Sequence, residues 1–157
     1  MITRAIENCI YNARTKGWSK TYWAFDVHGT ILKPTFTAGV VSTEFYPYAK
    51  EVLQLLSRQP NIARILYTCS YPNEIAGYLG YFERHGIHFD YVNENPEVCA
   101  GAYGHYDRKF YFNVLFEDKA GFDPLTDWKE VYQLLNNLLF TKTQVLCSAS
   151  TSSNSTR

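Results

Sequence analysis

The stretch YWAFDVHGTIL, residues 22–32, decides how the fold of this chain is interpreted. An apolar run of strand length leads into Asp26, a polar turn-like segment follows, and the chain becomes apolar again at Ile31. An aspartate that closes a strand is either a turn residue or a nucleophile, and His28 is an unusual neighbour for either role. The rest of the sequence has to decide between these two interpretations.

The composition indicates one packed domain without an overall charge. The chain has 157 residues, which suits a single domain with one sizeable core. Its 15 Lys and Arg balance 15 Asp and Glu, so no overall field attracts nucleic acid or an anionic membrane. Aromatic residues make up 17% of the chain, which is typical of a packed protein and not of a disordered one. We expect a single domain over residues 1–147.

The cysteines and the end segments predict where the protein resides. Its four cysteines lie far apart, without a CxxC pair or a histidine at metal-ligand spacing, so neither disulfides nor a zinc site is expected. No stretch approaches the ~18 consecutive apolar residues of a membrane span. We therefore expect a soluble, cytoplasmic protein without a membrane partner. The polar, low-complexity residues 148–157 are expected to form a disordered tail.

Hydrophobic patterns alternate between strand and helix along the chain. The strand-like runs are residues 21–25, 64–68, 89–92 and 111–116, and the helical patterns are residues 3–16, 48–59, 71–86 and 127–139. This order predicts an α/β domain, a three-layer Rossmann-like sandwich with a mainly parallel central sheet. Residues 33–46 carry β-branched residues on both sides of Gly39, which predicts a short hairpin-like flap after the first strand.

Polar residues suited to chemistry stand at the carboxyl ends of three predicted strands. These residues are Asp26 after the first strand, Thr68 and Ser70 after the second, and Glu117 with Asp118 after the last. In a parallel sheet the ligand crevice lies at this edge. Carboxylates driven together repel one another unless a cation holds them, and Mg²⁺ prefers carboxylate, water and phosphate oxygens. Lys109, just before the last strand, would add positive charge to the same edge.

These clusters resemble the four motifs of the haloacid dehalogenase (HAD) superfamily of phosphotransferases. FDVHGT, at residues 25–30, is similar to the family's DxDGT, and ILYTCS, at residues 65–70, resembles its second motif, a strand that ends in Thr or Ser. Lys109 is similar to the third motif, and VLFEDKAGFD, at residues 114–123, resembles the fourth, a strand that ends in paired acids. The motifs stand in family order and resemble the small phosphatases that lack a cap domain.

The resemblance implies a nucleophile and a metal site. Asp26 would attack phosphorus and form an aspartyl phosphate, which divides a difficult displacement into two easier steps. Mg²⁺ would be held by the Asp26 carboxylate, the backbone carbonyl of His28 and the acidic pair Glu117 and Asp118. Gly29 would let the backbone turn sharply beneath the phosphate.

Further roles follow from the same resemblance. Thr68, or alternatively Ser70, would donate a hydrogen bond to the transferred phosphoryl group, and Lys109 would offset its charge. Thr30 would tie the turn after the nucleophile. Asp123 would support the metal site indirectly, although an aspartate before a proline is also a common turn residue.

Two residues depart from the family pattern. Where the family usually has a second aspartate, as the acid and base of the reaction, this chain has His28. Histidine is a competent general acid and base with an unperturbed pKa of about 6.5, so we expect slow or pH-shifted hydrolysis and not its complete loss. Glu117 replaces the more usual aspartate, and its extra methylene can weaken Mg²⁺ binding because Mg²⁺ demands near-ideal geometry.

The sequence thus predicts a Mg²⁺-dependent HAD-like phosphatase. Its expected substrate is a phosphorylated small molecule or a nucleotide, with a nucleic-acid end as a further option. The alternative is a catalytically degenerate HAD-like binding or regulatory module, in which His28 and Glu117 mark lost catalysis. A third option is an α/β domain of unrelated function.

Overall fold

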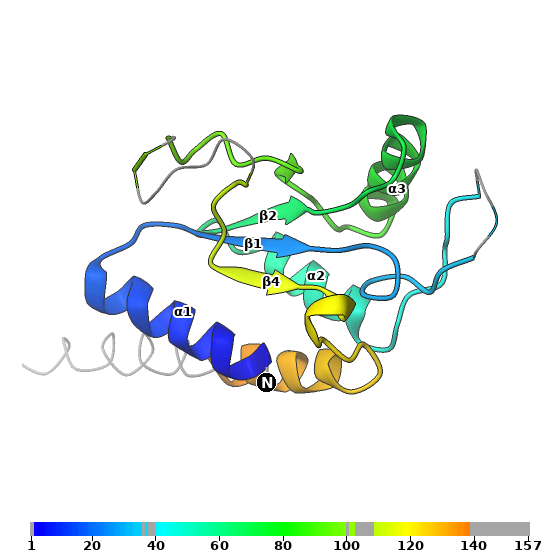
Figure 1. The fold of residues 1–157 in the computed structure, drawn as a ribbon. Coiled ribbons are helices and arrows are strands. Elements are labelled where there is room, and N and C mark those ends of the chain that lie inside the picture. The colour runs from blue at the N-terminus through cyan, green and yellow to red at the C-terminus, as the bar shows by residue number, and fades with distance from the viewer. Residues whose placement is uncertain (1, 36, 38–39, 100, 103–108, 139–157) are drawn as a thin grey trace, which may run out of the picture.

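The fold is built on a parallel sheet whose strands all run toward the same edge (Figure 1). The computed structural model describes residues 2–35, 37, 40–99, 101–102 and 109–138. Its strands are β1 (Thr21–Phe25), β2 (Ile62–Leu66), β3 (Tyr91–Val92) and β4 (Val114–Phe116). They pair in parallel in the order β3-β2-β1-β4. The helices are α1 (Ile2–Lys16), α2 (Ala49–Ser57), α3 (Pro72–Arg84), the short 3-10 turn η1 (Asp118–Ala120) and an unlabelled helix over residues 127–138.

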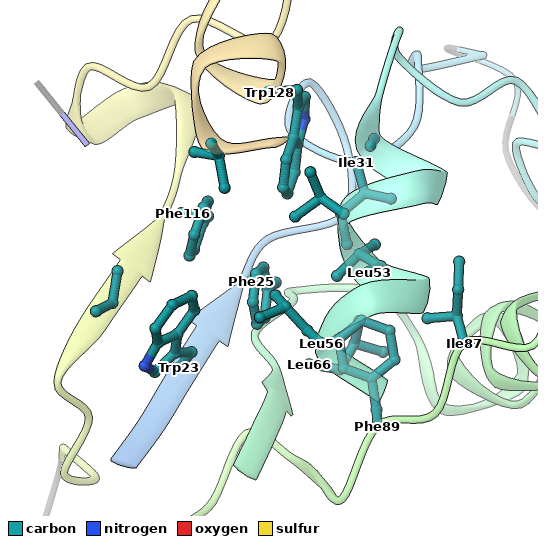
Figure 2. Packing of buried hydrophobic residues seen from close by; sticks show 14 of the residues in the cluster. Trp23, Phe25, Ile31, Leu53, Leu56, Leu66, Ile87, Phe89, Phe116 and Trp128 are labelled. Atoms are coloured by element: carbon teal, nitrogen blue, oxygen red, sulfur yellow. The ribbon is translucent and has the colours of Figure 1, made fainter. Parts of the chain in front are cut away.

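The hydrophobic core lies between the sheet and the helices. Trp23 and Phe25 share one face of β1 because side chains alternate along a strand, and both are fully buried. Phe25 stacks against Phe116 of β4 with 4.5 Å between ring centroids, and Trp128 stacks on Phe116 at 5.3 Å. Figure 2 shows this stack, with Leu53 of α2 in the same cluster. The aromatic rings thus join β1, β4 and the helix over residues 127–138.

The other face of β1 meets the connection between β3 and β4. Tyr22 points away from the Trp23 side by strand alternation, and its hydroxyl donates a hydrogen bond to Glu97. Its ring also meets Tyr111 edge-on, with 6.2 Å between centroids. The α/β prediction is confirmed: the central sheet is entirely parallel and flanked by helices, as in a Rossmann-like three-layer sandwich.

The strand positions agree with the sequence patterns, whereas some boundaries differ. β1 spans the predicted residues, but β2 ends before Thr68, because the Thr68 N–H donates to the Asn93 side chain instead of to a neighbouring strand. β4 begins after the predicted start for a similar reason. The Asn113 side chain accepts the Tyr22 N–H, so a side chain replaces one step of the backbone ladder.

A flap leaves the sheet after β1 and returns before α2. Leu32 and Phe45 form an antiparallel bridge at its base, and the Lys33 N–H donates to the Glu44 carbonyl at 2.9 Å. The predicted hairpin-like flap is therefore present at its base. Its predicted centre, Gly39, lies outside the described residues.

Two sequence predictions concern the ends of the chain. Residues 139–147 of the predicted domain and the predicted tail over residues 148–157 both lie outside the described residues. The described residues share a hydrophobic cluster that extends from Ile2 to Leu135. In the part of the chain that the structure describes, no helix is long and apolar enough to cross a bilayer.

Replacing Trp128 by Phe tests the link between the helix over residues 127–138 and the turn after β1. The Trp128 Nε1–H donates to the Thr30 carbonyl at 2.8 Å in a buried position. Trp128→Phe leaves that carbonyl without its donor, so we expect urea unfolding to show a loss of about 1–3 kcal/mol in the free energy of unfolding.

Trp23→Phe is the matched control for this substitution. Trp23 is equally buried, and its indole N–H has no oxygen acceptor among the described residues. The control should therefore lose less stability than Trp128→Phe. Equal losses in the two variants would show that the hydrogen bond to Thr30 contributes nothing to the link.

Candidate metal and phosphate site

The register of the sheet brings Asp26 and Glu117 together. Phe25 pairs with Phe116 across β1 and β4, so the next residue of each strand leaves the sheet at the same edge. The Asp26 N–H continues the ladder by donating to the Phe116 carbonyl at 2.9 Å. Ligand oxygens of Asp26, Glu117 and Asp118 all lie within 4.8 Å of one another. The structure thus brings together the three carboxylates that the sequence analysis predicts at strand ends.

The carboxylate cluster lies at the point where the strand order reverses. From β1 the chain builds outward through β2 and β3, and it then returns to pair β4 with the other side of β1. Binding crevices of open parallel sheets form outside the carboxyl ends of the strands at such a reversal. The cluster therefore stands where the topology alone predicts a ligand.

The turn after β1 is shaped to receive Asp118. Gly29 has a φ of +80°, and a Cβ on it would come within 2.7 Å of Asp118 Oδ2. The Asp118 N–H donates to Thr30 Oγ1 at 3.1 Å, and Thr30 is completely buried. Only glycine allows both the left-handed backbone and the close approach of this carboxylate.

The charges of the cluster are not balanced by the protein alone. Burial raises the pKa of Asp26, the Asp118 charge adds to this effect, and the more exposed Lys119 opposes it. Burial also raises the pKa of Glu117, together with a hydrogen bond to Asp118 and the charge of Asp26. The Asp26 Oδ2 atom is buried without a hydrogen-bond partner among the described residues. Loss of hydration disfavours each ionised form, and a cation would favour it.

The donor set fits Mg²⁺. Three carboxylates on adjoining strand ends provide hard oxygen ligands and leave room for waters and a phosphate oxygen, which is the coordination that Mg²⁺ prefers. No cysteine or histidine side chain belongs to the cluster in the described part of the chain, so the set lacks the ligands typical of Zn²⁺. A bound Mg²⁺ would also give the buried Asp26 oxygen its missing partner.

The cluster opens into a cleft of about 590 Å³. Its walls come from the ends of β1 and β4, the flap, the segment after β2, and α3. The lining residues are Asp26, His28, Pro34, Thr35, Thr37, Val40, Tyr67, Thr68, Cys69, Ser70, Tyr71, Glu74, Tyr78, Glu117 and Lys119. Carboxylates, hydroxyls and one lysine therefore share a single solvent-filled space.

Both predicted hydroxyl residues line this cleft. Thr68 Oγ1 and Ser70 Oγ lie 2.9 Å apart, so one donates a hydrogen bond to the other. The Asn93 side chain fixes the backbone of Thr68 on both sides, accepting its N–H at 2.8 Å and donating to its carbonyl at 2.7 Å. The choice between Thr68 and Ser70 as the phosphate donor stays open.

His28 is held by a tyrosine that the sequence analysis missed. Its Nε2 lies 2.6 Å from the Tyr78 hydroxyl of α3, which also accepts the Ser42 N–H from the flap at 3.3 Å. Burial raises the pKa of the Tyr78 phenol. The tautomer of His28 sets which partner donates in this hydrogen bond, and in either case the bond occupies Nε2. Nδ1 is then the ring nitrogen left to exchange a proton. The proposed ligand role of the His28 carbonyl stays a prediction.

The structure changes the choice of lysine. Lys109 is exposed, its Nζ lies 6.0 Å from the centroid of the Phe112 ring, and it is not a lining residue of the cleft. Lys119, which directly follows the acidic pair, does line the cleft, and its charge opposes the rise in the pKa of both Asp26 and Glu117. Its position next to two candidate ligands was the sequence signal that could have identified it.

Asp123 has a structural role. One of its carboxylate oxygens accepts the Leu125 N–H and the other accepts the Thr126 hydroxyl, each at 3.0 Å. These bonds shape the turn that leads into the helix over residues 127–138. The turn interpretation of Asp123 therefore describes its contacts better than support of the metal site.

Comparisons with known proteins establish the fold and not the function. No known protein family matches the sequence, and neither does any curated protein. A solved structure of a conserved protein from Bacteroides thetaiotaomicron is similar, with a TM-score of 0.58 and 23% sequence identity. The similarity covers 75% of this chain and 91% of that one. At this identity the likeness supports the α/β architecture alone.

Replacing Gly29 by Ala tests the approach of Asp118 to the turn. The new Cβ would displace the carboxylate, so we expect Gly29→Ala to abolish the rise in melting temperature that Mg²⁺ gives the native protein. At a Mg²⁺ concentration of about 100 times Kd, that rise corresponds to roughly 2.7 kcal/mol of binding-linked stability. Thermal unfolding with and without Mg²⁺ measures it.

Gly17→Ala provides the matched control. Gly17 has a similar φ of +68°, but an added Cβ meets nothing within 4 Å. We expect Gly17→Ala to cost about 1 kcal/mol through backbone strain and to keep the full Mg²⁺ response. A Mg²⁺ response that survives in Gly29→Ala would remove Asp118 from the metal site.

Proposed function

We propose that this chain is a Mg²⁺-dependent phosphomonoesterase of the HAD type, with Asp26 as the nucleophile. The observation that carries the proposal is the convergence of Asp26, Glu117 and Asp118 at the reversal point of a parallel sheet, where one buried Asp26 oxygen has no partner among the described residues. The hydroxyls of Thr68 and Ser70 in the same cleft support it. So does the resemblance of the strand-end motifs to those of the superfamily.

The first step would transfer the phosphoryl group to Asp26. A carboxylate oxygen of Asp26 attacks phosphorus, and the bond between phosphorus and the leaving oxygen breaks. Thr68 or Ser70 donates to a phosphoryl oxygen, and Lys119 offsets negative charge at the mouth of the cleft. Asp26, Glu117 and Asp118 would hold Mg²⁺, which would supply charge neutralisation.

The second step would hydrolyse the aspartyl phosphate. His28 gives a proton from Nδ1 to the leaving oxygen in the first step and then accepts one from the attacking water. Tyr78 holds Nε2 and fixes the ring for both transfers. An imidazole stands where the superfamily usually has a second aspartate as acid and base, so slow release of inorganic phosphate is the expected consequence.

Replacing Asp26 by Asn tests the nucleophile. We expect Asp26→Asn to lower kcat for phosphomonoester hydrolysis at least about 1,000-fold, because an amide oxygen is a poor nucleophile and a poor Mg²⁺ ligand. Release of inorganic phosphate from para-nitrophenyl phosphate, with Mg²⁺ or with a chelator, is the measurement.

The matched control for this test is Asp123→Asn. It makes the same chemical change outside the cluster, at a turn where asparagine serves about as well as aspartate. The control should keep its activity. Activity that is absent from the native protein, or unchanged by Asp26→Asn, would instead favour a binding or regulatory module.

The two lysines can be compared directly. Lys119→Met should lower kcat/KM about tenfold or more, because it removes the cation that lines the cleft. Lys109→Met should change kcat/KM less than about threefold, although both substitutions remove one exposed charge. Steady-state kinetics of the two variants on one substrate is the measurement. A larger loss of kcat/KM in Lys109→Met than in Lys119→Met would restore the role that the sequence analysis gave to Lys109.

A further inference from the structure

Exposed aromatic and apolar side chains gather at the same cleft. Among the described residues, the exposed large hydrophobic side chains are Tyr11, Val40, Tyr48, Tyr67, Tyr71 and Leu125. Val40, Tyr67 and Tyr71 line the cleft that holds the carboxylates. Single exposed hydrophobic residues need no explanation, but their concentration in one cleft indicates a ligand with an apolar surface.

The two tyrosines stand on a fixed backbone. The Tyr67 side chain is 39% exposed, and Phe110 packs edge-on behind it with 5.9 Å between centroids. The Tyr71 side chain is 74% exposed, yet its backbone N–H is held by Glu74 Oε2 at 3.0 Å where α3 begins. The Tyr67 ring thus has an aromatic neighbour, Tyr71 has a held backbone, and both residues line the cleft.

Sequence order ties these rings to the phosphate site. In the segment YTCSY, residues 67–71, the two tyrosines flank the two hydroxyl residues of the cleft. Thr68 follows Tyr67, and Ser70 precedes Tyr71. A ligand whose phosphate is held by either hydroxyl therefore has an aromatic ring within reach on the neighbouring residue.

The charge of the cleft limits the size of the ligand. Its charged lining residues are Asp26, Glu74 and Glu117 on the acidic side and Lys119 on the basic side. Among the described lining residues Lys119 is the one side-chain cation, so with Mg²⁺ the cleft suits the contacts of one phosphate group. A polynucleotide carries a run of phosphates and needs a basic groove along its backbone.

We propose that Tyr67 and Tyr71 form a subsite that stacks the base of a nucleoside monophosphate beside the carboxylate cluster. The position of its phosphate group rests on the proposed function. The subsite itself is defined by the tyrosines and is testable without turnover. It makes a nucleoside monophosphate a better substrate than a sugar phosphate that lacks the base.

Adenosine 5′-monophosphate and ribose 5-phosphate form a matched substrate pair, because they differ only in the base. Base stacking on an aromatic side chain corresponds to about a 5- to 160-fold effect, so we expect kcat/KM to favour the nucleotide by about tenfold or more. Tyr71→Ala and Tyr67→Ala should each reduce this preference, mainly through KM, with a larger loss for the nucleotide than for ribose 5-phosphate.

Two further variants separate stacking from general damage. Tyr71→Phe keeps the ring and should keep the preference. Tyr11→Ala removes a side chain that is 67% exposed on α1, away from the cleft, and should change neither substrate. Equal kcat/KM for the two substrates in the native protein, or an equal loss for both in Tyr71→Ala, would overturn the subsite.

Calorimetric titration of the two ligands, with Mg²⁺ present, distinguishes failure of the subsite from failure of the proposed function. Tighter binding of the nucleotide that depends on Tyr71, without turnover of either ligand, would support the subsite and refute the phosphatase. Turnover of both ligands, together with equal affinity for them, would support the phosphatase and refute the subsite. A 5′-phosphorylated oligonucleotide that is hydrolysed faster than the mononucleotide would overturn the proposal in favour of a nucleic-acid end.

Discussion

The parallel register between β1 and β4 is the constraint on which the site depends. Because Phe25 faces Phe116, the carboxylates of Asp26 and Glu117 must leave the sheet together, and Asp118 is drawn in beside them. Burial, with a smaller contribution from the neighbouring like charges, raises the free energy of the ionised cluster, as the raised pKa values of Asp26 and Glu117 indicate. A fold that keeps such a cluster gains stability when a divalent cation binds to it.

The surrounding structure holds the cluster in place from several directions. Thr30 accepts the Asp118 N–H with its hydroxyl and the Trp128 indole N–H with its carbonyl, so the turn is tied both to η1 and to the helix over residues 127–138. Tyr78 joins His28 to α3 and to the flap. The residues proposed to move protons and phosphate are therefore attached to rigid elements, although most of them lie on loops.

Much of this arrangement was predictable from sequence because strand patterns and strand ends are local signals. The run before Asp26 marks β1 correctly, and a parallel sheet then brings the polar ends of β1, β2 and β4 to one edge. Contacts between distant residues left no such signal. The partner of His28 lies 50 residues away. Nothing in the sequence distinguishes Asn93 from an ordinary loop residue, although its side chain accepts the Thr68 N–H and so ends β2 early.

The central claim is that Asp26 forms a covalent bond to phosphorus in a site that requires Mg²⁺. Its most direct test is to mix the protein with acetyl phosphate and Mg²⁺, quench the reaction, reduce with borohydride and sequence the peptides by mass spectrometry. The account predicts homoserine at position 26, formed by reduction of the aspartyl phosphate, and unmodified Asp26 when a chelator replaces Mg²⁺. Reduction at another carboxylate, such as Glu117, or at no residue would contradict it.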